Sequence, residues 1–374
     1  GGGEKKELPV KNMYKTFNKQ NLVRFILIPL LLTTSIILMS CGDKGTSANG
    51  PDISDLPSNP SPVFTHYLVN PDSIQGIVPP GSISDNTVAE KSYMFMKNTG
   101  TANPDYVGIY APVDMKLVAI AYRTSQGQNQ YLLMFQVSKE VKIRLDHIDF
   151  PVEAIRNAGP PTPSPNNDTH TSSPTKSVEF KAGDLIAYSN GTTSGVWDFG
   201  VSNSTYENNF VNINRYRNDP QDYEELHSVC PFKYFEDSVK SKYESLYALQ
   251  TGQPYKGATC RSASRDVAGT LSGLWYLDKA PHGDFSDVLA LASDFDGELR
   301  IGGLFGHTMF VKDTPTLPTL PENVKINDEV CYEDQGGGNF TFFKVLSNSQ
   351  VEVATGYSGC PAAFPTSNTE IYNR

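Results

Sequence analysis

From Phe64 onward the chain is a succession of short β-prone runs separated by turn residues. Runs of about four to eight residues rich in Val, Ile, Tyr and Phe, bounded by Gly, Pro, Asn or Asp, are typical of β-strands. The sequence therefore predicts a mainly β protein. The predicted strands are 106–110, 116–123, 131–137, 141–145, 177–180, 185–188, 196–201, 273–277, 288–292, 298–302, 308–311, 329–332, 340–346 and 350–354.

One stretch interrupts the β pattern. Residues 232–248 carry Phe235, Val239 and Tyr243 at the spacing of one helix face, and Gly252 follows as a stop signal. We therefore expect a short helical connector. The predicted parts are a first β domain over 64–225, the connector over 226–265, and a C-terminal β domain over 266–374 that forms a small meander or partial barrel.

The N-terminal segment has the pattern of an export signal. Residues 25–38 are an apolar run, Arg24 precedes it, and Cys41 follows shortly after it. A basic region, a short apolar region and a small residue at the cleavage point make a secretory signal peptide. We predict a signal peptide over 1–40, with the true start at Met13. A membrane-spanning anchor is the alternative, but the run is shorter than the ~20 residues that a span needs.

Leu38-Met39-Ser40-Cys41 resembles the lipobox of bacterial lipoproteins. The resemblance implies that the thiol of Cys41 is diacylated and becomes the mature N-terminus, so that the lipid bilayer is a partner. It also implies a location in the bacterial cell envelope, facing the periplasm or the cell exterior. Residues 41–63 are rich in Gly, Ser, Asn and Pro, which favours a flexible tether behind the lipidated cysteine.

The charge balance excludes one class of partner. The chain has 31 basic and 41 acidic residues, and residues 1–40 hold six of the basic and two of the acidic ones. Residue 41 onward therefore has 25 basic and 39 acidic side chains, a net charge of −14. Binding to nucleic acid needs clustered Lys and Arg to neutralise phosphates. We expect no nucleic-acid partner.

Four cysteines lie downstream of Cys41. In an exported protein they indicate two disulfides, for which three connectivities exist. We favour Cys230–Cys260 and Cys331–Cys360, because each pair encloses about thirty residues within one predicted unit. A four-cysteine zinc site is the alternative, but the spacing that such sites use is absent.

Four phrases between residues 104 and 205 resemble those of lysostaphin/LytM-type zinc endopeptidases, in the same order. The residues are 109–112 (IYAP), 144–148 (RLDHI), 180–187 (FKAGDLIA) and 197–201 (WDFGV). The resemblance implies a LytM-like fold, a small antiparallel β-sandwich or barrel known as the duplicated hybrid motif.

The catalytic residues of that family do not carry over. Gly108 stands where the family has its metal-binding aspartate, and Val196-Trp197-Asp198 stands where it has H-x-H. His147 matches a family histidine that assists catalysis. One histidine and one carboxylate make a weak metal site, whereas catalytic zinc has three protein ligands and an open position. We therefore expect no metal, no cofactor and no catalytic residue, and a remnant cleft lined by His147, Asp198 and Trp197.

Gly273-Leu274-Trp275 resembles the G-x-W that opens lipocalin barrels. A lipocalin has eight strands and about 150 residues, whereas about a hundred residues remain here. We expect a smaller meander or partial barrel with Trp275 in its core.

Three hypotheses of function follow. The preferred one is an inactive, lipid-anchored envelope protein that binds peptidoglycan or an envelope protein through the remnant cleft. The second is a zinc-dependent cell-wall endopeptidase with an atypical ligand set drawn from His147, Asp198 and His66. The third is a carrier of a small apolar ligand in the C-terminal barrel.

Overall fold

The computed structural model divides by its contacts into residues 1–46 and 47–374. It describes residues 52–84, 87–97, 105–125, 127–165, 170–191, 195–218, 223–249, 252–278, 288–303, 309–310, 319–333, 338 and 340–374. The predicted signal peptide and the lipidation site at Cys41 lie outside the described residues.

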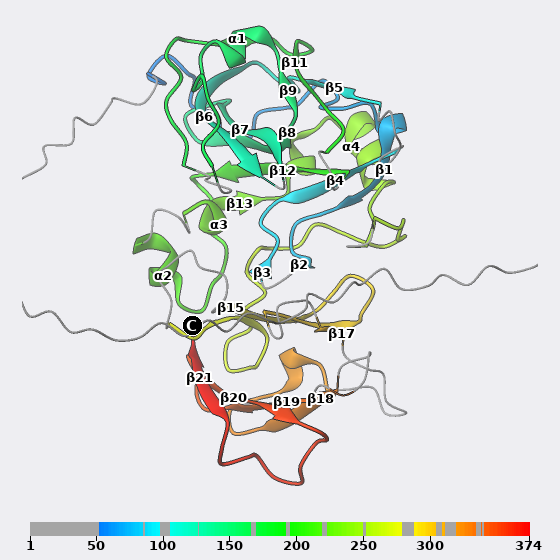
Figure 1. Cartoon of the computed structure of the whole chain (residues 1–374), viewed down its shortest axis with the longest axis vertical. Helices are drawn as coiled ribbons and strands as arrows, with labels where there is room; N and C mark the ends of the chain where they lie inside the picture. The colour runs from blue at the N-terminus through cyan, green and yellow to red at the C-terminus, as the bar shows by residue number, and fades with distance from the viewer. Residues whose placement is uncertain are drawn as a thin grey trace, which may run out of the picture. The chain divides into compact units, whose positions relative to one another are not determined.

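The first large sheet is antiparallel and has the strand order β1-β4-β12-β8-β7-β6-β10, with β13 paired to β12 (Figure 1). The long strands β6, β7, β8 and β12 have mostly buried side chains on successive residues. This pattern is typical of strands that are covered on both faces of a sheet. The bounds are β1 Ile74–Val78, β4 Ser92–Met96, β6 Met115–Ser125, β7 Gln128–Gln136, β8 Val141–Ile148, β10 Glu179–Phe180, β12 Val196–Asn203 and β13 Ser228–Val229.

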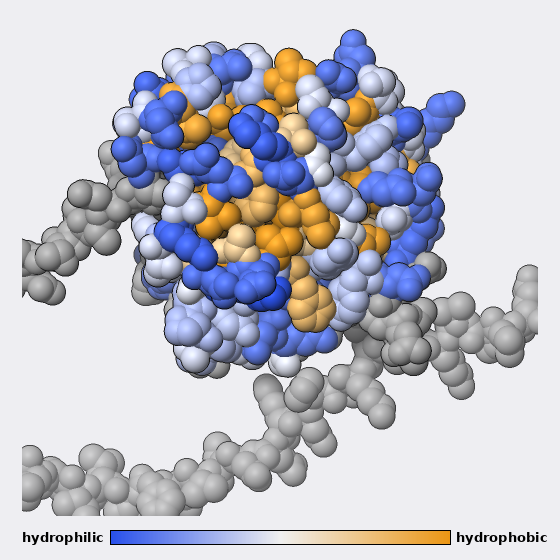
Figure 2. Space-filling view, turned by 90° about the horizontal axis from the view of Figure 1, so that it is seen from above, coloured by the Kyte–Doolittle hydropathy of each residue, from blue (hydrophilic) through white to orange (hydrophobic). Residues whose placement is uncertain are grey.

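A smaller three-stranded sheet, β5-β11-β9, packs beside it. Its strands are β5 Val107–Tyr110, β11 Leu185–Ser189 and β9 Phe150–Pro151. Ile109 of β5 and Ala187 of β11 are fully buried and belong to the same apolar core as Leu133 and Phe199 of the large sheet. Figure 2, which views the molecule from above Figure 1, shows apolar side chains gathered on the face where β5, β9, β11 and α1 lie.

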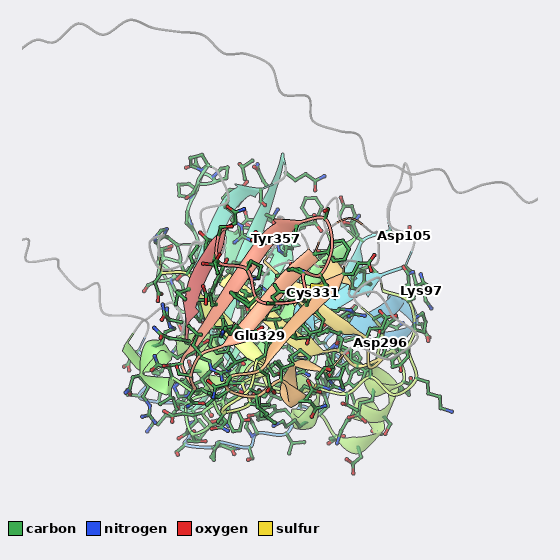
Figure 3. The ribbon with its side chains drawn as sticks, turned by 90° about the horizontal axis from the view of Figure 1, so that it is seen from below. Lys97, Asp105, Asp296, Glu329, Cys331 and Tyr357 are labelled. Carbon is green, nitrogen blue, oxygen red and sulfur yellow. A yellow bond between two sulfur atoms is a disulfide. The ribbon has the colours of Figure 1, made fainter. Side chains whose placement is uncertain are left out.

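The second large sheet, near the C-terminus, is an antiparallel arrangement of eight strands in the order β17-β16-β15-β14-β21-β20-β19-β18. Strand β14, the first of these strands along the chain, is hydrogen-bonded to β21, the last along the chain, where Tyr276 is opposite Asn373. Figure 3 shows the strands from below, with Glu329 and Cys331 on β18. The bounds are β14 Gly273–Tyr276, β15 Val288–Ser293, β16 Leu299–Gly302, β17 Met309–Phe310, β18 Glu329–Glu333, β19 Phe340–Val345, β20 Gln350–Tyr357 and β21 Thr369–Asn373.

The remaining elements are short. The hairpin of β2 Ile83–Ser84 and β3 Thr87–Val88 contributes Ile83 and Val88 to a core shared with Leu274 of β14 and Ala290 of β15. The helices are η1 Pro71–Ser73, α1 Glu153–Arg156, α2 Ile213–Asn218, α3 Tyr223–His227, η3 Pro231–Tyr234, α4 Asp237–Glu244 and η5 Pro321–Asn323.

The predicted mainly β class is confirmed: the sheets are antiparallel and include a half-barrel. All fourteen predicted strands have a counterpart within a few residues, whereas seven strands of the described residues were missed, namely β1, β2, β3, β4, β9, β13 and β21. The predicted helix over 232–248 is wrong in extent. The chain forms a 3₁₀ turn at η3 and then only the eight residues of α4, because Phe235 between them is extended and makes a backbone bridge to Phe64.

Both favoured disulfides are confirmed. Cys230 is bonded to Cys260 and Cys331 to Cys360. Each bond closes a loop of about thirty residues, which raises the free energy of unfolding by restricting the unfolded chain.

Candidate functional site

Strands β8 and β12 bring three possible metal-ligating side chains together. The Cα atoms of Asp146 and Asp198 are direct partners across the two strands, and His147 follows Asp146. Directly opposed residues project to the same face of an antiparallel pair. One ligand atom from each of Asp146, His147 and Asp198 lies within 4.8 Å of the others.

His147 has an unusual backbone. Its φ is 62°, in the left-handed region that few residues other than glycine adopt. Its amide donates to Oδ1 of Asp146 at 2.7 Å, and its Nδ1 lies 2.5 Å from Oε1 of Gln130. These contacts hold the ring with Nε2 3.7 Å from Oδ2 of Asp198. The histidine side chain is 27% exposed, whereas Asp198 is buried, so the ring is the part of the site that solvent reaches.

Three cationic side chains pair with the two carboxylates, and two of them also pair with neighbouring glutamates: Lys91 with Glu90 at 3.4 Å and Arg144 with Glu224 at 3.0 Å. The ammonium of Lys91 lies 3.0 Å from Oδ2 of Asp198. Arg123 donates to Oδ1 of Asp146 at 2.7 Å, and Arg144 approaches the other oxygen of Asp146 at 3.4 Å. We call these six residues, Lys91, Arg123, Arg144, Asp146, His147 and Asp198, the charged cluster.

The electrostatics of the charged cluster hold Lys91 and Asp146 in their ionised forms. Burial acts to lower the pKa of Lys91, but the carboxylates of Asp198 and Glu90 outweigh it and raise the pKa far above its usual value. Burial acts to raise the pKa of Asp146, and the charge of Arg144, followed by His147 and Arg123, outweighs it and lowers the pKa. Lys91 is therefore a fixed positive charge and Asp146 a fixed negative one at neutral pH.

The charged cluster does not fit a catalytic zinc ion. Zinc needs at least three protein ligands with free lone pairs and an open position. Here Oδ1 of Asp146 already accepts two hydrogen bonds, from Arg123 and from the amide of His147. The ammonium of Lys91 occupies Oδ2 of Asp198, where a metal would have to bind. A divalent cation would thus have to enter beside three positive side chains.

The candidate cleft residues fall into two groups. His147 and Asp198 lie together as predicted, but Trp197 is fully buried, and its indole N–H donates to the sulfur of Met96 at 3.1 Å. The prediction that Trp197 lines the cleft is therefore wrong, because strand alternation turns it into the core while its neighbour Asp198 faces the charged cluster. His66 lies elsewhere, beside the turn at Gly183, and is exposed.

Asp146, Lys91 and Arg123 were missed by the sequence analysis. The expectation of one carboxylate and one histidine was wrong, since Asp146 supplies a second carboxylate. A signal was present, because Asp146 directly precedes His147 in the LytM-like phrase. Lys91 precedes β4 and Arg123 lies on β6, and no motif connects them to β8.

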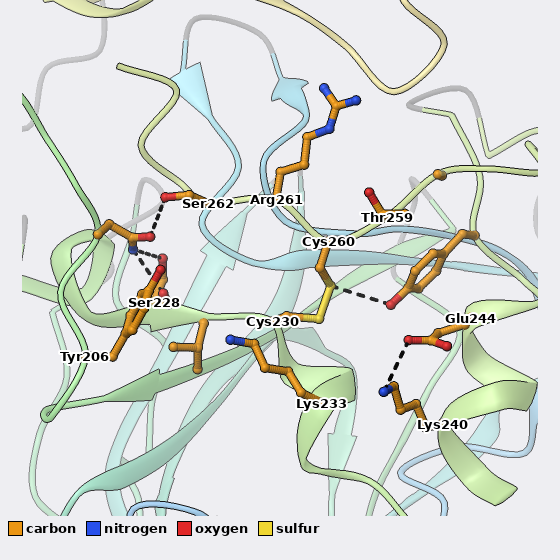
Figure 4. A pocket seen from close by; sticks show the side chains of 14 residues that line it. Tyr206, Ser228, Cys230, Lys233, Lys240, Glu244, Thr259, Cys260, Arg261 and Ser262 are labelled. Atoms are coloured by element: carbon orange, nitrogen blue, oxygen red, sulfur yellow. Dashed lines mark hydrogen bonds and ion pairs between the residues drawn. A yellow bond between two sulfur atoms is a disulfide. The ribbon is translucent and has the colours of Figure 1, made fainter. Parts of the chain in front are cut away.

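A pocket of about 610 Å³ lies beside the Cys230–Cys260 disulfide (Figure 4). The ammonium of Lys233 faces the ring of Tyr206 at 5.4 Å. The size suits a small molecule. Other charges in the wall are already engaged: Lys240 pairs with Glu244, and the guanidinium of Arg261 donates to the carbonyl of Ser293.

The expectation that Trp275 lies in the core of the C-terminal sheet is confirmed. It is fully buried, and its indole N–H donates to the carbonyl of Leu271 at 2.9 Å. The guanidinium of Arg374 stacks on its ring at 4.0 Å and donates to the carbonyls of Ser272, Thr270 and Asn348. The sheet has eight strands, one more than the seven predicted over these residues, because β21 was missed.

Comparison with protein-family models, with curated proteins and with solved structures finds no match to this chain. Within the described part of the chain, the structure has no helix of the length and apolarity that a bilayer span requires.

Proposed function

We propose that this chain is a non-catalytic, lipid-anchored protein of the bacterial cell envelope that binds cell wall or an envelope protein through a LytM-like domain. The observation that carries the proposal is the pairing of Asp146 and Asp198 with Lys91, Arg123 and Arg144. In a zinc peptidase the corresponding charge is supplied by the metal, which polarises the substrate and lowers the pKa of bound water. Here protein side chains supply the positive charge, and they are already paired with carboxylates rather than free to bind and acidify a water molecule as a metal does.

The LytM-like interpretation is supported by the position of the two motif strands. The RLDHI phrase forms β8, the WDFGV phrase lies in β12, and the two strands are hydrogen-bonded neighbours. The surface at which this site would meet a ligand is the solvent-facing side of His147, since Asp146 and Asp198 are buried beneath it.

The lipid anchor and the envelope location rest on the sequence pattern around Cys41. Metabolic labelling of the full chain with a radioactive fatty acid tests them directly. We expect label in the wild type and none in Cys41→Ser, while a Cys331→Ser control keeps the label. Labelling of the Cys41→Ser chain would contradict the proposal.

The binding function is tested by sedimenting the full chain with purified peptidoglycan sacculi and assaying the same mixture for released muropeptides. We expect co-sedimentation without release, and weaker co-sedimentation for His147→Ala than for the exposed control His66→Ala. If the wild type does not co-sediment with sacculi, the cell wall is not the partner. Muropeptide release that EDTA abolishes would refute the non-catalytic assignment.

A zinc-dependent cell-wall endopeptidase is the second candidate, because Asp146, His147 and Asp198 have ligand atoms within 4.8 Å of one another. It would require a metal ion to displace Lys91 from Asp198. The apolar-carrier hypothesis has less support, since Trp275, Leu289 and Phe343 are fully buried and pack in one core on the C-terminal sheet.

A further inference from the structure

The outward face of the small sheet β5-β11-β9 is aromatic. Side chains that are 39–50% exposed gather there, although large apolar side chains of that exposure are few in the described residues. The four residues are Tyr106, Tyr110, Phe150 and Tyr188, and we call them the aromatic face. Figure 2 looks toward the side of the molecule on which this sheet lies.

Strand register places these residues on one surface. Tyr188 of β11 is the direct partner of Phe150 on β9 and of Gly108 on β5. Opposed residues share a face, so Phe150, Tyr188 and position 108 form one row across the three strands. The next row, Ile109 and Ala187, is fully buried on the opposite face.

Position 108 accommodates only a glycine, because the ring of Tyr110 takes the space of a side chain there. A Cβ atom there would come within 2.9 Å of Cε2 and Cζ of Tyr110 and within 2.7 Å of its hydroxyl oxygen. The ring of Tyr110 therefore lies against Gly108 and fills the place of the missing side chain in the row, and Tyr110 remains 39% exposed.

The remaining ring joins the two outer strands. Tyr106, just before β5, meets Phe150 of β9 edge to face, with ring centroids 4.9 Å apart and an interplanar angle of 70°. The four exposed rings therefore lie on one side of the small sheet, and two of them are in direct contact. A cluster of exposed aromatic side chains held this way indicates a binding surface, because single exposed apolar residues are ordinary but contiguous patches are not.

The size and charge of the aromatic face favour a narrow, uncharged partner. Four aromatic side chains at this exposure present about 300–400 Å², from roughly 150–250 Å² per ring. A stable protein interface needs about 800 Å² from each partner. The chain as a whole has a net charge of −10, which opposes attraction to an anionic membrane. Tyrosine rings combine a flat apolar face with a polar hydroxyl, which matches the C–H face and hydroxyl rim of a pyranose ring.

Chain connectivity places the aromatic face next to the strand that carries His147. Phe150 follows His147 by three residues, and the hydroxyl oxygen of Ser189, at the end of β11, lies 2.6 Å from Oδ2 of Asp149 and 3.2 Å from the carbonyl oxygen of His147.

We infer that the aromatic face is the glycan-binding surface of this protein, on which N-acetylated sugar rings of a polysaccharide strand stack. This inference rests on the proposed cell-wall function for the identity of the polymer, but the stacking surface itself is defined by the four rings.

The test uses the full chain and two probes, the soluble hexamer of N-acetylglucosamine in calorimetry and purified sacculi in sedimentation. We expect Phe150→Ser/Tyr188→Ser to weaken hexamer binding by about four- to hundredfold, since each of the two lost aromatic contacts contributes a factor of roughly two to ten. Tyr188→Phe should bind within about twofold of the wild type. Ile371→Ser is the matched control for Tyr110→Ser, because both side chains are 39% exposed and Ile371 lies on β21 of the other large sheet, and only Tyr110→Ser should weaken binding.

The outcomes separate the two proposals. Sacculus binding that survives in Phe150→Ser/Tyr188→Ser overturns the inference and leaves the cell-wall function standing. If the wild type binds the hexamer but does not co-sediment with sacculi, the result supports glycan binding by the aromatic face and counts against the cell-wall function. A wild type that does not bind the hexamer, or that dimerises through these residues in sedimentation velocity, overturns the inference. Melting curves equal to that of the wild type show that the variants are folded.

Discussion

The ammonium of Lys91 lies 3.0 Å from Oδ2 of Asp198, and both side chains are largely or fully shielded from water. A buried charge is stable only when it is paired, and this pair takes the place that a metal and a carboxylate would otherwise share. Asp146, His147 and Asp198 have the spacing of metal ligands, but the two carboxylates are already bound in ion pairs with Lys91, Arg123 and Arg144.

Removing one side of this pair should be strongly destabilising. We expect Lys91→Met to lower the free energy of unfolding by about 3–5 kcal/mol, because Asp198 would remain buried and unpaired. Urea denaturation measures it. The double variant Lys91→Met/Asp198→Leu should recover much of the loss. The control Lys181→Met, whose partner Asp114 is 59% exposed, should change stability by less than about 1 kcal/mol.

Zinc should distinguish the wild type from a variant without the lysine. Since Lys91 blocks Asp198, we expect zinc to leave the melting temperature of the wild type unchanged. In Lys91→Ala, Oδ2 of Asp198 becomes free beside Nε2 of His147, and zinc should raise the melting temperature by mass action. Differential scanning fluorimetry with and without EDTA measures the effect. A zinc-dependent rise in the wild type that His147→Ala removes would instead support a native metal site.

Stability should decline in acid partly through Asp146. Its pKa in the folded chain is lowered by Arg144, His147 and Arg123 against the opposing effect of burial. A depressed folded-state pKa contributes stability that is present above the unfolded value of about 3.9 and is lost as the pH falls through the folded value. We expect the free energy of unfolding to fall as the pH drops below about 5, and the slope to be smaller in Asp146→Asn. The exposed control Asp105→Asn should keep the wild-type slope.

Each disulfide should stabilise the fold by a similar amount. A loop of about thirty residues predicts a loss of about 3–4 kcal/mol when the bond is removed. We therefore expect Cys230→Ala/Cys260→Ala and Cys331→Ala/Cys360→Ala each to lower the urea midpoint. A variant in which Cys230, Cys260, Cys331 and Cys360 are all replaced by Ala has neither disulfide. Dithiothreitol should lower the urea midpoint of the wild type to that of this variant and should leave the midpoint of the variant unchanged. A midpoint that stays unchanged in either double variant would contradict this account.

Arg374 should be important for the C-terminal sheet although it is far from the charged cluster. It stacks on Trp275 and donates to three backbone carbonyls, which a shorter side chain would leave unpaired. We expect Arg374→Ala to lower the free energy of unfolding by about 2–4 kcal/mol. Arg374→Lys should restore only part of it, because an ammonium lacks the planar fork of donors. Trp275 fluorescence during unfolding reports the change.

The strands were the most predictable part of this fold. The runs that became β6, β7, β8 and β12 have β-branched and aromatic side chains between clear turn signals, so local sequence indicates them. Strands β1 and β4 were missed, although each pairs along most of its length. The helix over 232–248 was overextended because its aromatic spacing also suits a turn that packs Phe232 and Phe235 against Tyr243.

The candidate site was predictable only in part. His147 and Asp198 could be named because each lies in a LytM-like phrase. Trp197 was placed in the cleft because the phrase alone does not say which of two adjacent strand residues faces the core. Lys91 and Arg123 have no signal in the sequence, since their role arises from neighbours that are far away along the chain.

The sequence by itself indicated most of the strands, a favoured pairing of the cysteines and a charge balance unsuited to nucleic acid, because these depend on residues close together in the chain or on composition. The tertiary structure alone decided that the carboxylates of Asp146 and Asp198 are paired with Lys91, Arg123 and Arg144, and that four aromatic rings share one face. Both features depend on strand register and on which side of a strand faces the core. A shift of one residue would reverse every side chain along a strand, and only the packed fold selects the register.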